Sequence, residues 1–105
     1  MIMNEENTAA LIEAVCTHQI EEVAQLLTDG TDPNGIIDEA ALTPLHFAVS
    51  HESTESILLL LSVGANCLQE DDDGESALEK AIQLNRKDAV KIFAFHLGIN
   101  LTITE

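Results

Sequence analysis

The chain has 105 residues, of which 46% are hydrophobic, which fits one globular domain and excludes an intrinsically disordered chain. It carries 19 acidic residues against four basic ones, for a net charge of -15. All four cations lie between Lys80 and Lys91, so direct binding to nucleic-acid phosphates or to anionic lipid is disfavoured and a protein partner with a basic surface is favoured. Solubility alone is the alternative explanation of the charge.

The N-terminal segment 1–8 is acidic and polar, with neither the cationic start nor the apolar stretch of a secretory signal. No window approaches the roughly 18 apolar residues of a membrane span. The sequence therefore predicts a cytoplasmic protein, with non-classical secretion as an effector left open. Cys16 and Cys67 are too few for a disulfide scaffold or a zinc site, so we expect both to be reduced and semi-buried.

Two apolar helical segments are predicted in the first third of the chain, separated near His18 and ended by Gly30. A glycine in that place can adopt the left-handed conformation that terminates a helix. The sequence Asp32-Pro33-Asn34-Gly35 that follows is typical of a turn, and we expect it to form the tip of a projecting β-hairpin.

The central unit, 38–70, has the clearest pattern. The segment 42–48 reads Leu-Thr-Pro-Leu-His-Phe-Ala and opens a helix, with Thr43 as its cap and Pro44 at a first helical position. A second apolar helix is predicted over 55–63, and Gly64 ends it. The acidic run 70–75 then forms a second turn.

The pattern recurs with a period of about 33 residues. A forward shift places Ser76 on Thr43, and a backward shift places Leu11 on Leu45 and Gly30 on Gly64. The central unit resembles the ankyrin signature T-P-L-H-x-A followed by I/V-x-L-L-L-x-x-G-A-[DN]. The third unit departs from it, because Ser76 and Glu79 replace the threonine and histidine, and in the first unit Ala9 and Ile12 occupy those positions.

The resemblance implies an all-α ankyrin-repeat solenoid of three helix-turn-helix units with short β-hairpin fingers. We expect one domain over 1–105, with repeats at approximately 5–37, 38–70 and 71–101, the outer two being degenerate caps. The resemblance also implies that the His46 imidazole bonds the Thr43 hydroxyl and nearby backbone, tying repeats together. The residues expected to carry the structural motif are Thr43, Pro44, Leu45, His46, Gly30 and Gly64.

No catalytic constellation is predicted, so the chain is not expected to be an enzyme. Cys16 and His18 diverge near a helix end, and the phosphate-binding glycine motifs are absent. The acidic run 70–75 fails as a calcium loop because Lys80 stands where a bidentate glutamate is required. A solvated finger tip is the favoured interpretation, weak nonspecific divalent binding is the alternative, and neither a metal nor a cofactor is expected.

Ankyrin proteins hold partners through finger tips and the exposed face of each first helix, so the resemblance implies a non-enzymatic protein-binding module acting as inhibitor, adaptor or effector. Its first finger is partly apolar and its second almost wholly acidic, which suits a basic partner. The alternatives are an acidic mimic of nucleic acid that blocks a DNA-binding protein, or acidity for solubility combined with homodimerisation. The predicted partner-binding residues are Ile37, Glu39, Ala40, Leu42, Ser50, His51, Glu70, Asp72, Asp73, Glu75, Gln83 and Leu84.

The C-terminal end offers two readings. Phe93 falls on a core position of the repeat, whereas Phe95 falls on one that is usually polar. The alternating tail 99–103 could fold over the exposed end as a lid, or could form a dimer seam with Phe95. A monomer is favoured over a homodimer.

Overall fold

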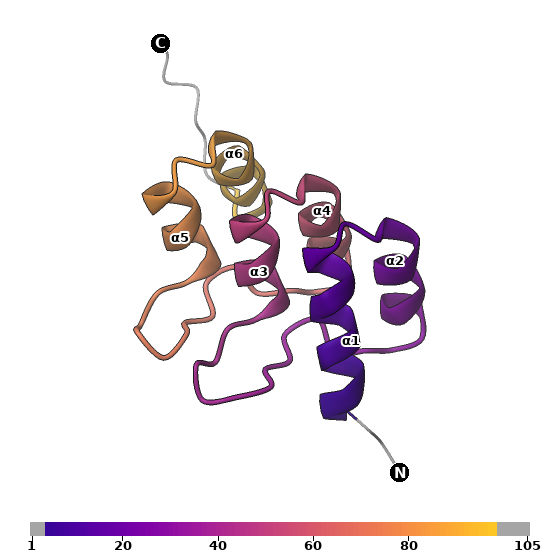
Figure 1. Cartoon of the computed structure of the whole chain (residues 1–105). Coiled ribbons are helices and arrows are strands. Elements are labelled where there is room, and N and C mark those ends of the chain that lie inside the picture. Colours follow the sequence, from indigo (N-terminus) through magenta and orange to yellow (C-terminus); the bar gives the residue numbers. More distant parts are fainter. Residues whose placement is uncertain (1–3, 99–105) are drawn as a thin grey trace.

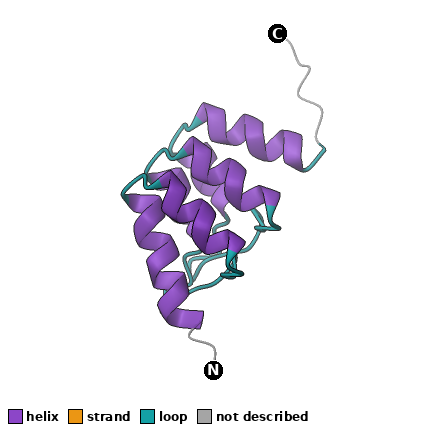
Figure 2. Cartoon of the chain, turned by 90° about the vertical axis from the view of Figure 1, so that its right-hand side faces the viewer, coloured by secondary structure: helices purple, strands orange, loops and turns teal. Residues whose placement is uncertain are grey.

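The computed structural model describes residues 4–98, which form six helices arranged in two rows (Figure 1). The inner row contains α1 (Asn4–Cys16), α3 (Pro44–Ser50) and α5 (Ala77–Gln83). The outer row contains α2 (Ile20–Thr28), α4 (Thr54–Ser62) and α6 (Lys87–His96). Consecutive helices pair, and each pair packs on the next within both rows, which confirms the predicted all-α stack of three units. Seen from the side, the helices lie next to one another with the loops gathered at their ends (Figure 2).

The inner helices α3 and α5 begin with the same hydrogen-bonded device. The Thr43 hydroxyl accepts from the His46 N–H, and His46 Nδ1 accepts from the Thr43 N–H at 3.0 Å. In α5 the Ser76 hydroxyl accepts from the Glu79 N–H at 3.1 Å, and Glu79 Oε1 accepts from the Ser76 N–H at 2.9 Å. Both are capping boxes, which satisfy amide groups that a helix start leaves unpaired. The serine and glutamate that depart from the family motif therefore preserve its local function.

The core runs along the whole stack between the two rows. Leu11, Leu45 and Leu60 are 0–1% exposed, and Phe93 is fully buried as predicted. Gly30 and Gly64 end α2 and α4 with φ values of 99° and 100°, a backbone conformation that favours glycine. The helices thus bury one continuous apolar layer, consistent with repeats that cannot bury their faces singly.

The two fingers are loops over 31–43 and 65–76 that project to the same side of the stack (Figure 1). Within residues 4–98, their only strand-like feature is an isolated antiparallel bridge between Glu70 and Ser76. Short turns closed by aspartate side chains, together with a bond from the Asp72 N–H to the Ala40 carbonyl at 2.8 Å, satisfy backbone groups that paired strands would otherwise use. The hairpin element of the prediction is therefore reduced to this one bridge.

The prediction that residues 32–35 form the tip of the first finger is wrong. Asn34 lies at the base of the finger, where its Oδ1 accepts from the Asn66 N–H at 2.7 Å and its Nδ2 donates to the Gly64 carbonyl at 3.2 Å. The tip turns instead at Asp38, whose carboxylate accepts from the Ala40 N–H at 3.0 Å. Both segments contain residue types that favour turns. Asn34 acquires its partners in the next unit only because the repeats stack.

Gly35 allows the base of the first finger to lie against α1. A Cβ at this position would stand 2.5 Å from the Thr8 hydroxyl oxygen. Thr8 is itself buried, with 3% of its surface exposed. The absence of a side chain is therefore a packing requirement of the first repeat.

The C-terminal predictions concern residues that the structure describes only in part. Phe95 is 86% exposed on α6, whereas the tail 99–103, to which a lid or a dimer seam was assigned, lies outside the described residues. The boundaries 5–37, 38–70 and 71–101 remain a prediction, since the last also runs past Gly98. Among the described helices, none is long and apolar enough to cross a membrane.

Candidate protein-binding surface

The predicted partner-binding residues are all accessible, on the fingers and at the ends of the inner helices. Two of them are half-buried, Leu42 and Glu75. The exposed ones are Ile37, Glu39, Ala40, Ser50, His51, Glu70, Asp72, Asp73, Gln83 and Leu84. Their use in binding stays a prediction, and the contacts described below define what this surface offers a partner.

Asp71 is a structural residue of the second finger and not part of a uniformly solvated tip. Its side chain is only 5% exposed, and its Oδ1 accepts from the N–H groups of Asp73 and Glu75, each at 2.9 Å. The N–H of Glu75 foremost, helped by that of Asp73 and opposed by burial, lowers the pKa of the Asp71 carboxyl. The expectation of a simple solvated run is therefore wrong at this position.

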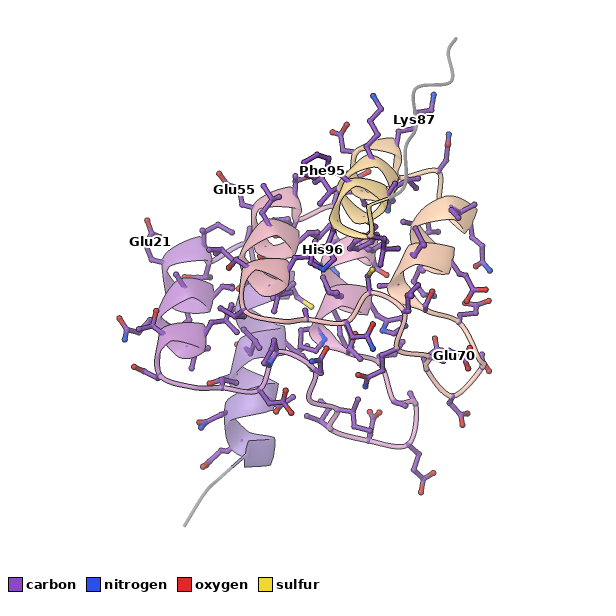
Figure 3. The ribbon with its side chains drawn as sticks, turned by 180° about the vertical axis from the view of Figure 1, so that it is seen from behind. Glu21, Glu55, Glu70, Lys87, Phe95 and His96 are labelled. Carbon is purple, nitrogen blue, oxygen red and sulfur yellow. The ribbon has the colours of Figure 1, made fainter. Side chains whose placement is uncertain are left out.

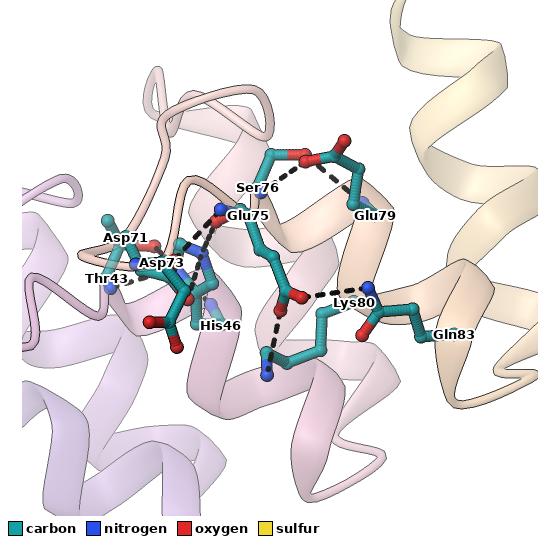
Figure 4. A network of polar contacts seen from close by, with 9 residues as sticks. All are labelled: Thr43, His46, Asp71, Asp73, Glu75, Ser76, Glu79, Lys80 and Gln83. Carbon is teal, nitrogen blue, oxygen red and sulfur yellow. Dashed lines mark hydrogen bonds and ion pairs between the residues drawn. The ribbon is translucent and has the colours of Figure 1, made fainter.

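His46 joins the central repeat to the second finger (Figure 4). Its Nδ1 accepts from the Thr43 N–H at 3.0 Å, while its Nε2 lies 2.8 Å from the carbonyl oxygen of Glu75. An amide can only donate and a carbonyl can only accept, so these partners assign the neutral imidazole with the proton on Nε2. The side chain is 1% exposed, and its Nδ1 lies 2.8 Å from the Thr43 hydroxyl oxygen, the contact that the resemblance implied.

Glu75 attaches the inner side of the second finger to α5 (Figure 4). Its carboxylate lies 3.7 Å from the Lys80 ammonium and accepts from the Gln83 side-chain amide at 2.9 Å. Two of the predicted binding residues, Glu75 and Gln83, are thus engaged with each other. Among residues 4–98, no ion pair involves the carboxylates of Glu70, Asp72 or Asp73, so these three groups form the acidic tip.

An apolar patch lies on the neighbouring finger. Ile36 and Ile37 are 42% and 40% exposed. The two fingers are joined by the bond from the Asp72 N–H to the Ala40 carbonyl at 2.8 Å. Apolar and acidic groups therefore belong to one connected surface, the arrangement that gives an interface both affinity and discrimination.

Arg86 has a cross-repeat role that the sequence did not reveal. Its guanidinium donates to the carbonyls of Val49 and Ser50, each at 3.1 Å, and lies 2.8 Å from the Glu52 carboxylate. It thereby satisfies carbonyls at the end of α3, where a cation is also favoured by the helix dipole. No local motif marks such a contact, because its partners are supplied by the preceding repeat.

The described residues contain no group of three or more His, Cys, Asp or Glu side chains placed to hold a metal ion. Burial raises the pKa of both cysteine thiols, Cys16 and Cys67, which disfavours the reactive thiolate. Both are free thiols; Cys16 is half-buried as expected, whereas Cys67 is 1% exposed and lies deeper than the expected half-burial.

Stacked helix pairs with joined, projecting loops define a repeat protein of the class that binds through an extended surface. Residues 11–105 match the family described as ankyrin repeats, in three copies. The chain belongs to the ankyrin-repeat family, whose repeats are non-catalytic modules for protein–protein interaction.

Two relatives share part of the chain. The 2-5A-dependent ribonuclease of Mus musculus is 41% identical over 61 residues, which are 58% of this chain and 8% of that protein. The interferon antagonist OPG040 of vaccinia virus (strain Western Reserve) is 33% identical over 85 residues, which are 81% of this chain and 29% of that protein. The chain thus spans less than a third of the length of either relative.

Replacing Asp71 with asparagine is expected to lower the free energy of unfolding by about 1–2 kcal/mol at neutral pH, because the two amides lose a charged acceptor. The folded pKa of Asp71 is depressed, so its stabilisation is fully present above the unfolded value of about 4 and is lost as pH falls through the folded value. Urea unfolding between neutral pH and pH about 2 should therefore show a flatter acid profile for Asp71→Asn than for the parent chain.

Asp72→Asn is the matched control. The Asp72 side chain is exposed, and the hydrogen bond from the Asp72 N–H to the Ala40 carbonyl uses backbone atoms only. Its stability and acid profile should follow those of the parent. Parallel acid profiles for the parent and Asp71→Asn would show that the Asp71 carboxylate is not the group held by the turn.

Proposed function

We propose that this chain is a non-enzymatic module that binds a protein with a basic surface through its fingers and inner helix row. The observation that carries the proposal is the acidic tip, Glu70, Asp72 and Asp73, connected to the apolar Ile36 and Ile37 of the neighbouring finger. Exposed isoleucines give a partner apolar area to bury, and adjacent carboxylates select a cationic rim around it.

The fingers are held in place before any partner arrives. Asp71 closes the second finger on its own backbone, and Glu75 bonds it to α5. At the base of the first finger, Asn34 bonds the next repeat. Loops that are already ordered lose little freedom on binding, so more of the contact energy remains as affinity.

The charge distribution supports a basic partner. The chain has a net charge of -15, and Arg86 and Lys80 are both engaged with glutamates of the chain itself. A surface of one sign raises the association rate of an oppositely charged protein, and the effect is screened by salt. The proposal therefore predicts an association that is fast at low salt and slower at high salt.

We propose that the chain acts in the cytoplasm as an inhibitor or as an adaptor. The vaccinia relative is named as an interferon antagonist, and the similar segment covers 81% of this chain. A binding module without a reaction of its own acts by occupying its partner or by bringing two proteins together. Mimicry of nucleic acid is less well supported, because the unpaired finger carboxylates gather at one tip instead of forming rows.

Affinity capture from a lysate of the source organism tests this proposal at low and at high salt. We expect one predominant basic protein whose recovery falls as salt rises. Recovery of a varied set of polymerases and nucleases would favour the mimic instead. Turnover of a small molecule by the purified chain alone would contradict a non-enzymatic role.

A further inference from the structure

Two positions of each repeat carry apolar side chains that the following repeat covers. They hold Val15 and Val23 in the first repeat and Val49 and Ile57 in the central one. All four side chains are at most 1% exposed, and Ala89 of α6 lines the same groove as the central pair. The covering elements are helices, since α3 and α4 pack on α1 and α2, and α5 and α6 pack on α3 and α4. Each of these places therefore receives helices.

The third repeat keeps apolar residues at the same two positions, where the described residues leave them uncovered. A shift of about 33 residues leads to Ile82 on α5 and Val90 on α6. Ile82 is 59% exposed and Val90 is half-buried. A repeat that only ends a stack carries a polar outer face. The exposed apolar pair is therefore a candidate interaction site.

Cations flank this exposed pair, although the chain is acidic as a whole. Lys87 and Lys91 lie one helical turn apart on α6, and they line a groove of about 330 Å³ together with Ile82, Asn85 and Val90. We call these five residues the end face. None of them is acidic, and within residues 4–98 no ion pair involves either lysine.

The two lysines are a property of this end of the stack and not of the repeat. Their places are taken by Thr54 and Leu58 in the central repeat. Along the outer row, Glu21 marks α2 and Glu55 marks α4, whereas Lys87 lies at the far end of the row on α6 (Figure 3). The end face thus offers a partner positive charge beside apolar surface, the reverse of the charge on the acidic fingers.

We propose that the end face binds an α-helix of another protein, one that carries apolar side chains on one face and carboxylates beside them. Ile82 and Val90 contact the apolar side of that helix, and Lys87 and Lys91 pair with its carboxylates. The occupant is helical because helices cover the equivalent places within the stack. Its acidity follows from two lysines that make no ion pair among residues 4–98. None of these residues belongs to the fingers, so the inference does not depend on the proposed finger surface.

Selection from a displayed library of helical peptides tests the proposal, with the full chain as bait. All peptides share an apolar face of alanine and leucine, and the positions beside it vary among glutamate, glutamine and lysine. Peptides that bind an Ile82→Ser variant are removed first, because they bind elsewhere on the chain. We expect glutamate to predominate over lysine in the peptides that remain. Salt near 0.15 M gives a screening length of about 8 Å, which limits long-range repulsion between these peptides and the acidic chain.

Charge reversal shows whether the lysines make the contact. A variant with both Lys87→Glu and Lys91→Glu should bind a selected peptide at least about tenfold more weakly than the parent chain. Leu58→Ser, at a 51% exposed position on α4, should bind it as the parent does. In nuclear magnetic resonance spectra of the parent, the peptide should shift the amide signal of Val90 and leave that of Asp72 in the second finger unchanged.

Selected peptides rich in lysine, or no selected peptides at all, would overturn the proposal, and so would full binding by the double lysine variant. Self-association that Ile82→Ser abolishes in sedimentation would assign the end face to a second copy of the chain. Peptides recovered only with a Leu101→Ser variant as bait would assign it to the tail 99–105. Either assignment would also overturn the proposal. Circular dichroism of each variant confirms that a loss of binding is not a loss of folding.

Discussion

Replacing Leu45 with alanine is expected to lower the free energy of unfolding by about 2–5 kcal/mol. Leu45 is 1% exposed in α3, the central inner helix, which packs on α1, α4 and α5. Truncation removes apolar burial and leaves a cavity that neighbours on three sides cannot all close. Urea unfolding followed by circular dichroism measures the change.

Leu58→Ala is the control for this prediction. It removes the same atoms from the same repeat, but Leu58 is 51% exposed on α4. Its effect should stay within about 0.5 kcal/mol. A loss below about 1 kcal/mol for Leu45→Ala would show that α3 is not the centre of the stack.

Replacing His46 with alanine is expected to cost about 2–4 kcal/mol, because the Thr43 N–H and the Glu75 carbonyl both lose a buried partner. His46→Gln should cost clearly less, since glutamine at this position of a capping box can still accept from the first amide. The comparison separates hydrogen bonding from the loss of packed volume. Equal losses for both variants would contradict the proposed bonding role.

Hydrogen exchange gives a local test of the same contacts. The Thr43 amide should exchange faster in His46→Ala than in the parent chain, because its acceptor is removed. The Ser76 amide is held by Glu79 in the neighbouring box and should change less. Uniform acceleration at both amides would indicate general loosening of the stack.

The sequence predicts the architecture because the repeat encodes its own local starts and stops. Thr43 and Pro44 begin a helix, and Gly30 and Gly64 end two others, each through interactions within a few residues. Ser76 and Glu79 look like a weakened copy of the motif, yet they form the same capping box. A serine followed three residues later by a glutamate is itself a capping-box sequence, so this pair predicts the start of α5 as clearly as the family motif predicts the start of α3.

The parts that could not be predicted depend on partners from another repeat. Asn34 and Arg86 each bond backbone groups about one repeat away in sequence, and no local pattern marks them. Asp71 is different, since Asp-x-Asp-Gly is a turn sequence whose first aspartate commonly accepts backbone N–H groups. The prediction of a uniformly solvated acidic run missed this difference, because Asp71 lies inside the turn whereas Asp72 and Asp73 lie outside it.

The charges that a partner can reach are those that are not bonded within the chain. Charged residues that hold the fingers, such as Asp71 and Glu75, point to backbone or to α5, while Asp72 and Asp73 remain exposed. A partner would therefore meet a small number of fixed carboxylates and not a diffuse negative surface. That distinction makes the function testable by neutralising charges at different places.

Association kinetics of two charge-matched variants with the captured partner test the central claim most directly. The finger variant carries Glu39→Gln, Asp72→Asn and Asp73→Asn. The outer-row variant carries Glu21→Gln, Glu22→Gln and Glu55→Gln, and two of these positions are labelled in Figure 3. Each removes three negative charges from exposed positions.

At low salt, the finger variant should associate about tenfold more slowly than the parent, and the outer-row variant within about twofold of it. The difference should shrink at high salt, where charges on the two faces are screened alike. Equal slowing of both variants, or an unchanged rate for the finger variant, would contradict binding through the acidic finger surface.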